Sequence, residues 1–379
     1  MKIVINAINL KSAGGLTVAL NFIDQINRKK QNDLKVTVLA PTNAGYEKYA
    51  TEYVNIEIVS DNVSSPYKRV VTDYTWLMKR IEEIKPDVVF SMGNIAAPTQ
   101  RRQAVLFMFP YSIYLDDVYI WNLMTRFNRL KYRFKNWIFS RRLKYTDVVF
   151  PQTKTSEERL LRYYPHIKNT KIVPMAYSTL GQENSQLASP LFTRKEGYRY
   201  LLCLTKYYMH KNVEVFLPLA QLIKNQGLPI KIVTTIGADQ APGAAQFLEN
   251  VNRLDLEDVI LNIGPVSVDT VPSLYAMTDG LILPTLLESF SATYADALHY
   301  KKPIFTADRD FAHDVCADCA FYFNPHNPKD ILTTIQHAFE NPNLLNEKVE
   351  KGFIRSETFP DWEQVADMYL SELKILAES

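Results

Sequence analysis

The stretch Leu281-Ile-Leu-Pro-Thr-Leu-Leu-Glu288-Ser-Phe-Ser-Ala-Thr-Tyr-Ala-Asp296-Ala-Leu298 carries the strongest structural signal in the chain. A short apolar run leads into a polar passage and then into apolar residues at helical spacing, which predicts a strand, a loop and a helix. We place the strand at 280–283 and the helix at 290–299. Such a succession is typical of βαβ units, so this stretch favours an α/β fold with a mostly parallel sheet.

The same alternation extends in both directions from this stretch. Further strands are predicted at 2–7, 35–40, 87–91, 104–108, 147–150, 199–204, 230–235, 259–262 and 303–305. Further helices are predicted at 16–30, 121–144, 211–226, 243–252, 271–277, 328–340 and 361–377. Two α/β series in tandem predict a ligand-binding cleft between the carboxyl ends of their strands.

The length of 379 residues exceeds the size of a single hydrophobic core, so two domains are expected. The polar passage Ser178 to Pro190 lacks periodicity and is interpreted as their connection. We predict a Rossmann-like first domain over 1–175 and a Rossmann-like second domain over 176–355. A terminal segment over 356–379 is predicted to form a helix that packs back on the first domain.

The composition is that of a soluble globular protein, with 47% hydrophobic and 22% charged residues. We expect a cytoplasmic protein, because no run approaches ~20 apolar residues and the chain opens directly with a strand instead of a signal peptide. Three cysteines make no disulfide framework. Cys316 and Cys319 form a lone CxxC, which is interpreted as two reduced thiols.

The charge is unevenly distributed between the two halves of the chain. Residues 1–180 hold 27 Lys+Arg against 15 Asp+Glu, and residues 181–379 hold 16 against 26. The first half therefore suits an anionic partner or surface.

Residues 126–144 concentrate this basic charge, with eight basic residues and no acidic one among several aromatic residues. Two interpretations stay open. The helix contacts anionic lipid as a peripheral protein at the inner face of a membrane, or its aromatic residues face the core while its arginines are solvated. Nucleic acid is not expected, because nothing else resembles a nucleic-acid-binding module.

Two carboxylates flank the predicted start of the helix at 290. Glu288 lies in the loop and Asp296 about two turns into the helix, and free backbone N–H groups are expected at Ser289, Phe290, Ser291 and Ala292. Such a helix start is a ready anion site. The alternative is that acids near a helix N-terminus are simply favoured by the helix dipole.

Two lysines follow the strand predicted at 199–204. Lys206 and Lys211 would stand in a loop at the carboxyl end of that strand, where cations stabilise the charge that develops on a departing nucleoside diphosphate. The alternative is a pair of solvated surface lysines.

The order of these elements resembles the large retaining GT-B glycosyltransferase family that includes sucrose synthases and bacterial mannosyltransferases. Members carry Glu-x7-Glu and Arg-x4-Lys elements, and here the spacing is kept as Glu288-x7-Asp296 and Lys206-x4-Lys211. The resemblance also covers 261–275, 314–325 and Trp362. It spans the second domain well and the first domain more loosely.

The resemblance implies a donor site in the second domain. By it, Lys206 and Lys211 hold the donor diphosphate and Glu288 binds a hydroxyl of the transferred sugar. Backbone amides from Ser289 to Ala292 complete the phosphate site, Asp296 binds the ribose, and the backbone around Gly264 to Val266 lies near the base.

The resemblance also implies a reaction. The expected enzyme is a metal-independent hexosyltransferase that retains the anomeric configuration, with the leaving phosphate accepting the proton of the acceptor. Its donor would be a UDP-, GDP- or TDP-sugar, with no other cofactor. Its acceptor would be a carbohydrate, free or lipid-linked, in the synthesis of a surface polysaccharide or glycan.

The sequence departs from the family pattern at several positions. Asp296 replaces glutamate, Lys206 replaces arginine, and Ser289 and Ser291 replace glycines. Many relatives carry a donor-binding histidine in the first domain, where this chain has Phe107 to Tyr111 and no histidine before His166. These departures keep a second hypothesis open, a GT-B-fold protein without catalysis that acts as a binding or scaffold partner.

Gly14 and Gly15 lie in the predicted loop between the first strand and the first helix. Paired glycines let backbone amides approach a phosphate or an acceptor, and the family has a glycine-rich loop here. The alternative is an ordinary βα turn. It is not a dinucleotide fingerprint, because G-x-G-x-x-G is absent.

Overall fold

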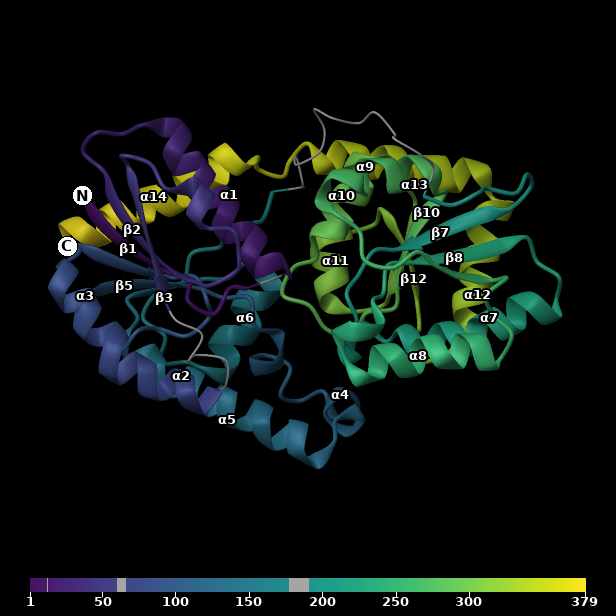
Figure 1. The fold of residues 1–379 in the computed structure, drawn as a ribbon. Coiled ribbons are helices and arrows are strands. Elements are labelled where there is room, and N and C mark those ends of the chain that lie inside the picture. Colours follow the sequence, from purple (N-terminus) through teal and green to yellow (C-terminus); the bar gives the residue numbers. More distant parts are fainter. Residues whose placement is uncertain (12, 60–65, 177–190) are drawn as a thin grey trace. The chain divides into compact units, whose positions relative to one another are not determined.

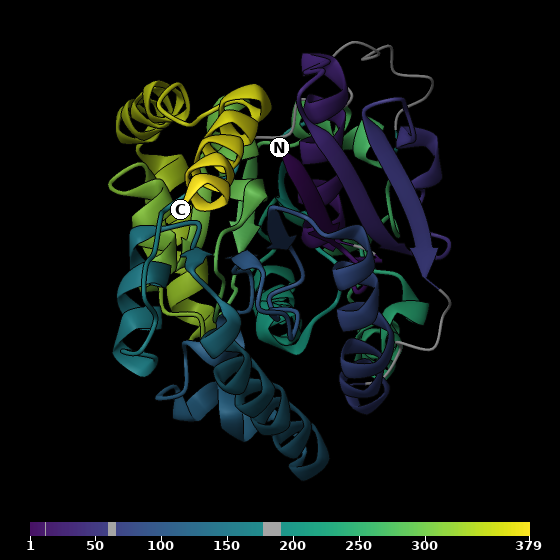
Figure 2. The same ribbon diagram turned by 90° about the vertical axis from the view of Figure 1, so that its left-hand side faces the viewer.

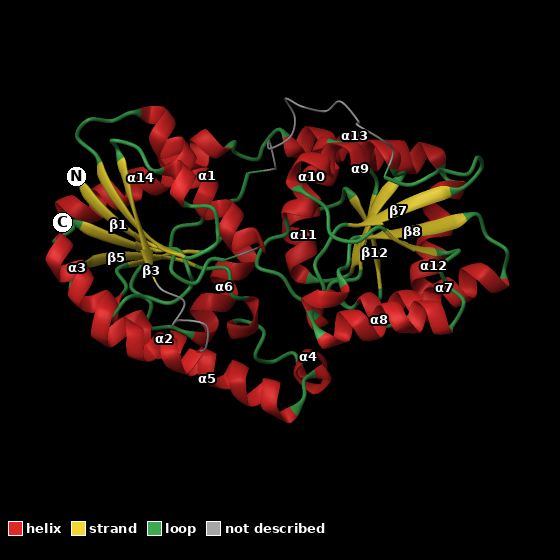
Figure 3. Cartoon of the chain, viewed as in Figure 1, coloured by secondary structure: helices red, strands yellow, loops and turns green. Residues whose placement is uncertain are grey.

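The computed structural model describes residues 1–11, 13–59, 66–176 and 191–379 of the chain, which divides into two compact units. The first unit contains Met1–Ala176 and Pro360–Ser379, and the second contains Tyr177–Phe359. Each unit has its own six-stranded sheet with helices packed around it (Figures 1 and 3). The predicted α/β class with two Rossmann-like domains is confirmed. The predicted connection at 178–190 lies outside the described residues.

The sheet of the first unit is parallel, with the strand order β3-β2-β1-β4-β5-β6. Five of its strands were predicted within two residues at each end. The prediction missed β3, an edge strand in which Asn55 and Glu57 interrupt the apolar pattern. The strands are β1 (Lys2–Asn6), β2 (Lys35–Pro41), β3 (Val54–Val59), β4 (Val88–Ser91), β5 (Arg102–Leu106) and β6 (Val148–Phe150).

The predicted helix at 121–144 is two helices, because two capping residues interrupt it. The Asp117 carboxylate accepts from the N–H of Ile120, and the Thr125 hydroxyl accepts from the N–H of Asn128, so each residue starts its own helix. The helices of this unit are α1 (Ala13–Lys29), α2 (Pro66–Thr72), α3 (Met78–Ile84), α4 (Val118–Leu123), α5 (Arg126–Arg142), α6 (Lys154–Tyr163) and α14 (Trp362–Glu378).

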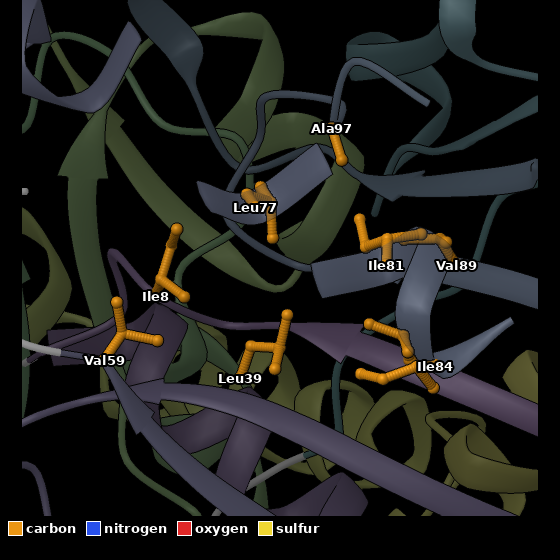
Figure 4. Close-up of a cluster of buried hydrophobic side chains, with 9 residues drawn as sticks. Ile8, Leu39, Val59, Leu77, Ile81, Ile84, Val89 and Ala97 are labelled. Atoms are coloured by element: carbon orange, nitrogen blue, oxygen red, sulfur yellow. The ribbon is translucent and has the colours of Figure 1, made fainter. Parts of the chain in front are cut away.

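One face of the first sheet is covered by α3 and by the π-helical turn Asp73–Leu77. Leu77 and Ile81 from these segments pack against Leu39 and Val89 from the strands (Figure 4). Each fully buried side chain of this type contributes about 1.5–3 kcal/mol to folding. This apolar layer holds the strands in place, and the loops follow their carboxyl ends.

The C-terminal helix α14 belongs to the first unit although it follows the second in sequence. A capping box between Asp361 and Gln364 starts it. The ring of Tyr369 lies 5.1 Å from that of Phe90 and 5.5 Å from that of Phe22, between centroids. The apolar face of α14 is therefore buried among aromatic side chains of the strands and of α1.

The sheet of the second unit is also parallel, with the order β12-β11-β10-β7-β8-β9. Its strand β12 was not predicted, although it is as long as β10 and β11. The strands are β7 (Arg199–Cys203), β8 (Ile230–Thr234), β9 (Ile260–Asn262), β10 (Gly280–Leu283), β11 (Ile304–Ala307) and β12 (Ala320–Phe323).

The predicted helix at 211–226 begins only at Phe216, because short 3₁₀ turns at Met209–Lys211 and Val213–Val215 precede it. The helix α13 was not predicted. It buries only Gly352 and Ser356, so its apolar periodicity is weak. The helices of this unit are α7 (Phe216–Asn225), α8 (Pro242–Arg253), α9 (Val271–Met277), α10 (Ala292–His299), α11 (Asp310–Cys316), α12 (Pro328–Glu340) and α13 (Pro342–Ser356). Within the described ranges, no helix is long and apolar enough to span a membrane.

Candidate functional site

The strand order of the second unit reverses direction between β7 and β10. The chain runs from β7 outward to β9, and then returns to place β10 on the other side of β7. The loops that follow these two strands therefore leave in opposite directions at the carboxyl edge of the sheet. Open parallel sheets bind their ligands at such a switch point.

Lys211 and Glu288 meet at this switch point. Lys211 ends the 3₁₀ turn after β7, Glu288 lies in the loop after β10, and Nζ of Lys211 donates to Oε1 of Glu288. Their side chains are only 14% and 12% exposed. The structure thus brings together two of the three predicted catalytic residues as a shielded ion pair.

Asn212 fastens the loops around this pair. Its backbone is left-handed, with φ of 55°. Its amide nitrogen lies 3.3 Å from the carbonyl oxygen of Pro284 and 2.8 Å from that of Pro325. The loops after β7, β10 and β12 are therefore joined by one buried carboxamide.

His210 joins the same two loops through its backbone. Its carbonyl accepts a hydrogen bond of 2.8 Å from the N–H of Leu286. Desolvation, and secondarily the Lys211 ammonium, lower the pKa of the His210 ring well below its ordinary value. The ring is therefore neutral at pH 7.

The helix α10 begins beside Glu288 without a side-chain cap. Its N-cap residue is Ser291, whose side chain makes no capping hydrogen bond and whose hydroxyl pairs with that of Thr293 at 2.8 Å. The residues predicted for the phosphate site, Ser289, Phe290 and Ser291, are all buried. First-turn amides without a side-chain cap, next to an ammonium group, are suited to an anionic ligand.

Asp296 is the fifth residue of α10, which starts at Ala292. It lies little more than one turn into the helix, not two turns as predicted, because the loop runs two residues further than expected. The side chain is buried, and its charge contributes, after burial, to raising the pKa of Tyr275 well above its ordinary value. Asp296 is therefore placed near Tyr275, whose hydroxyl donates to the carbonyl of Thr293.

Lys206 is exposed, and within the described residues no ion pair holds it. The residues around it are fixed instead. The N–H of Thr205 donates to the hydroxyl of Thr235 at 3.1 Å, and the N–H of Tyr207 donates to the side-chain oxygen of Gln240 at 2.7 Å. The backbone of this loop is held while the ammonium group of Lys206 remains open to solvent.

Gly264 and Val266 lie in the segment after the edge strand β9. Gly264 has φ of 74°, a conformation that favours glycine. The carboxamide of Asn262 accepts from the N–H of Ile236 and donates to its carbonyl, at 3.0 and 2.9 Å. These two hydrogen bonds join the end of β9 to the loop after β8 at the carboxyl edge of the sheet.

In the first unit, Gly14 and Gly15 lie in the first turn of α1, while the adjoining Ser12 is outside the described residues. A Cβ atom on Gly14 would meet no heavy atom within 4 Å, and one on Gly15 would lie 2.9 Å from Cδ2 of Leu10. Packing among the described residues therefore constrains Gly15 but not Gly14.

The segment Phe107 to Tyr111, which stands where relatives carry a histidine, is occupied by aromatic packing. Phe107 is buried, and the ring of Tyr111 lies 4.2 Å from that of Tyr132 on α5. The N–H of Met108 donates to the side-chain oxygen of Asn94. The segment is thus anchored to the loop after β4 and to α5.

Sequence reasoning gave no role to Asn212 or Gln240. The available signal for Asn212 was its position directly after Lys211, where asparagine tolerates the left-handed conformation of a tight turn. Gln240 carried no signal, because its partner Tyr207 is 33 positions away and is brought near only by the pairing of β7 with β8.

Residues 189–354 match the model of the family described as Glycosyl transferases group 1. This range contains Lys206, Lys211, Glu288 and Asp296 in the order and spacing of the predicted motifs. The match covers most of the second unit. The predicted family resemblance is confirmed.

Known proteins similar to this chain include the O-antigen chain mannosyltransferase RfbU of Salmonella typhimurium, at 23% identity over 194 residues. That match covers 50% of this chain and spans about half, 52%, of the curated relative.

Solved structures are similar over essentially the whole chain. A glycosyltransferase from Rickettsia africae has a TM-score of 0.74 at 13% identity, covering 100% of this chain and 99% of its own. The Anabaena protein HepE, in complex with UDP and glucose, has a TM-score of 0.70 at 13% identity, covering 99% and 100%. These similarities show the GT-B fold.

Proposed function

We propose that this protein is a group 1 glycosyltransferase that transfers a hexose from a nucleotide sugar to a carbohydrate acceptor, with retention of the anomeric configuration. The observation that carries the proposal is the Lys211–Glu288 pair at the switch point, beside the first turn of α10. A cation, a hydrogen-bond acceptor and open amides are the three groups that a sugar diphosphate requires.

Each residue has a role in the proposal. Lys211 leaves Glu288 to bind the diphosphate, and Lys206 adds a second cation from the same loop. Glu288 then accepts from a hydroxyl of the transferred sugar. The amides at Ser289 to Ala292 bind phosphate oxygens, Asp296 binds the ribose, and the backbone of Gly264 to Val266 borders the base.

The reaction we propose needs no resident metal or other cofactor, because lysine ammonium groups balance the charge that builds on the leaving diphosphate. The leaving phosphate oxygen accepts the proton of the attacking hydroxyl on the same face of the sugar. Full transfer in the presence of a metal chelator is the expected result, and an absolute requirement for Mg²⁺ would contradict it.

Similar proteins suggest which donors to test first. HepE was solved with UDP and glucose, and RfbU is named as a mannosyltransferase of an O-antigen chain. UDP-glucose and nucleotide-activated mannose are therefore the first donors to test, followed by other UDP-, GDP- and TDP-sugars. We propose an acceptor in surface polysaccharide or glycan synthesis, lipid-linked and presented at the inner face of a membrane that the protein contacts through residues 126–144.

The test combines donor calorimetry with an assay of transfer. Lys211→Met and Glu288→Gln are expected to lower transfer by about 100-fold or more, as expected for groups that stabilise charge in the transition state. The exposed pair of Lys301 and Glu350 in the same unit supplies matched controls, Lys301→Met and Glu350→Gln, which should leave transfer unchanged. Unchanged transfer in both site variants would overturn the assignment.

One observation favours a second function, that of a binding or scaffold protein without catalysis. The aromatic segment Phe107 to Tyr111 stands where many relatives carry a donor-binding histidine. Donor binding without turnover on any acceptor would favour it, and turnover with the wild-type chain would exclude it.

A further inference from the structure

The helix α5 turns an apolar stripe to solvent. Phe127 is 76% exposed, Leu130 67% and Trp137 55%, and Phe134 lies on the same stripe. The alternative in which these aromatic residues face the core is wrong for this stripe, although Phe139 is buried. Exposed large apolar residues gathered on one surface mark an interaction site.

The preceding helix α4 also exposes apolar residues, Val118, Tyr119 and Leu123. The N-terminal turns of α5 and the neighbouring α4 extend away from the sheet of the first unit (Figures 1 and 2). The face is therefore presented outward from the unit that carries it.

The charge around the stripe has one sign. No acidic residue occurs from Val118 to Thr146, and eight basic residues lie between Arg126 and Lys144. One of them, Arg142, is buried against Asp73 and does not contribute to the surface. An apolar stripe flanked by basic residues is complementary to an anionic lipid surface.

A cavity of about 420 Å³ opens beside this stripe, lined by Leu115, Trp121, Arg129, Arg133 and Asn136. The three lining residues of α5 recur at intervals of four and three. They occupy a face about a third of a turn from the stripe. The cavity therefore lies next to the surface that would meet the lipid.

Two buried polar atoms of the cavity residues lack hydrogen-bond partners. Asn136 is only 8% exposed and donates from its amide nitrogen to the carbonyl of Tyr111 at 3.1 Å, which leaves its oxygen Oδ1 without a donor among the described residues. Nε of Arg129 likewise has no acceptor there. Buried polar groups are normally paired, so a ligand that supplies both partners is expected.

The two atoms define the chemistry of that ligand. The Arg129 guanidinium, with Arg133 beside it, requires an anionic acceptor such as a phosphate oxygen. The Asn136 oxygen requires a donor such as a hydroxyl group. A phosphodiester that carries a hydroxyl-bearing headgroup supplies both.

We propose that this cavity binds the phosphodiester headgroup of an anionic phospholipid while the stripe inserts into the membrane. The inference rests on the membrane contact of the proposed function, but not on its transfer reaction. Binding would fix the first unit on the membrane in one orientation, at a distance set by the insertion of Phe127 and Leu130.

The test is co-sedimentation of the full chain with vesicles of three compositions. Phosphatidylcholine alone carries no net charge, its mixture with phosphatidylglycerol supplies a phosphodiester charge and headgroup hydroxyls, and its mixture with phosphatidylmethanol supplies the same phosphodiester charge without a hydroxyl. We expect binding in the order phosphatidylglycerol, phosphatidylmethanol, phosphatidylcholine. Phe127→Ser with Leu130→Ser should abolish binding to all three.

Matched substitutions on α5 separate the cavity from general charge. Arg129→Gln removes a charge at the edge of the cavity, and Arg126→Gln removes the same charge three positions upstream, at a residue that does not line it. Asn136→Leu removes the unpaired oxygen. Arg126→Gln should weaken binding to phosphatidylglycerol vesicles about fivefold. Arg129→Gln should weaken it at least about tenfold. Thermal unfolding followed by circular dichroism verifies that each variant is folded.

The outcomes separate the proposals. If the wild-type chain binds no anionic vesicle, the membrane contact and the cavity assignment both fall, while donor binding is judged by its own assay. Equal losses for Arg126→Gln and Arg129→Gln would overturn the cavity assignment alone. Soluble glycerol phosphate that binds as tightly as the vesicles would show that a free phosphate ester, not a lipid, is the ligand.

Discussion

Nζ of Lys211 donates a hydrogen bond to Oε1 of Glu288 across 77 positions of sequence. The contact exists because β7 and β10 are hydrogen-bonded neighbours and the two residues follow these strands. Each of these shielded charges is stabilised by the other. Removing one of them leaves an uncompensated charge that destabilises the folded protein.

The first prediction concerns this pair. Lys211→Met and Glu288→Gln should each lower the free energy of unfolding by about 1–3 kcal/mol, less than for a fully buried pair because water still reaches both side chains. The double variant should lose less than the sum of the two single losses. Chemical denaturation of the four proteins measures the coupling, and additive losses would show that the two charges do not interact in solution.

Asn212 allows a sharper test, because its backbone conformation and its hydrogen bonds can be separated. Asn212→Gly keeps the left-handed conformation and loses the bonds to Pro284 and Pro325. Asn212→Ala loses both. We expect the Asn212→Ala variant to be less stable than the Asn212→Gly variant by about 1 kcal/mol. Both variants should raise the KM for donor, because the loops after β7 and β10 are no longer joined. Wild-type KM in both variants would exclude a positioning role.

His210 predicts a dependence of stability on pH. Its folded-state pKa lies well below the ordinary value of 6.5, so on acidification the unfolded chain takes up a proton that the folded chain does not. The free energy of unfolding should therefore fall as pH drops below about 6.5, by up to about 1.4 kcal/mol per pH unit. The variant His210→Asn should show a smaller fall between pH 7.5 and 5.5. His299, whose pKa burial also lowers, contributes equally to both proteins, so an identical fall would remove His210 as the cause.

Gly14 and Gly15 distinguish an ordinary turn from a ligand-binding one. Since a Cβ on Gly14 would meet no described atom, Gly14→Ala should stabilise the chain by up to about 1 kcal/mol through helix propensity. We also expect Gly14→Ala to lower transfer. If a bound phosphate or acceptor approaches the backbone at this exposed position, the added methyl group would block it. Gly15→Ala is the control, in which the contact with Leu10 should cost stability. A Gly14→Ala enzyme that is both stabilised and fully active would identify the loop as an ordinary βα turn.

Apolar runs and helical periodicity accounted for most of the fold. The strands β1 and β10 follow from short continuous apolar runs, because helices cover both faces of a parallel sheet. The helices α1 and α14 follow from apolar residues at helical spacing, because one face of each helix is buried. Prediction failed for β3 and α13, where polar or small residues replace that pattern. It also failed at Asp117 and Thr125, whose capping hydrogen bonds divide one amphipathic stretch into α4 and α5.

The sequence by itself determined which residues share an element and which chemistry they carry, because side-chain type and helical or strand spacing are local properties. That is why Lys211, Glu288 and the basic helix could be named in advance. Tertiary structure alone decided that Lys211 meets Glu288, since this depends on the order of strands in the sheet. It also decided that the stripe of Phe127 and Trp137 is exposed, since periodicity shows which side chains share a face and only packing shows whether another element covers it.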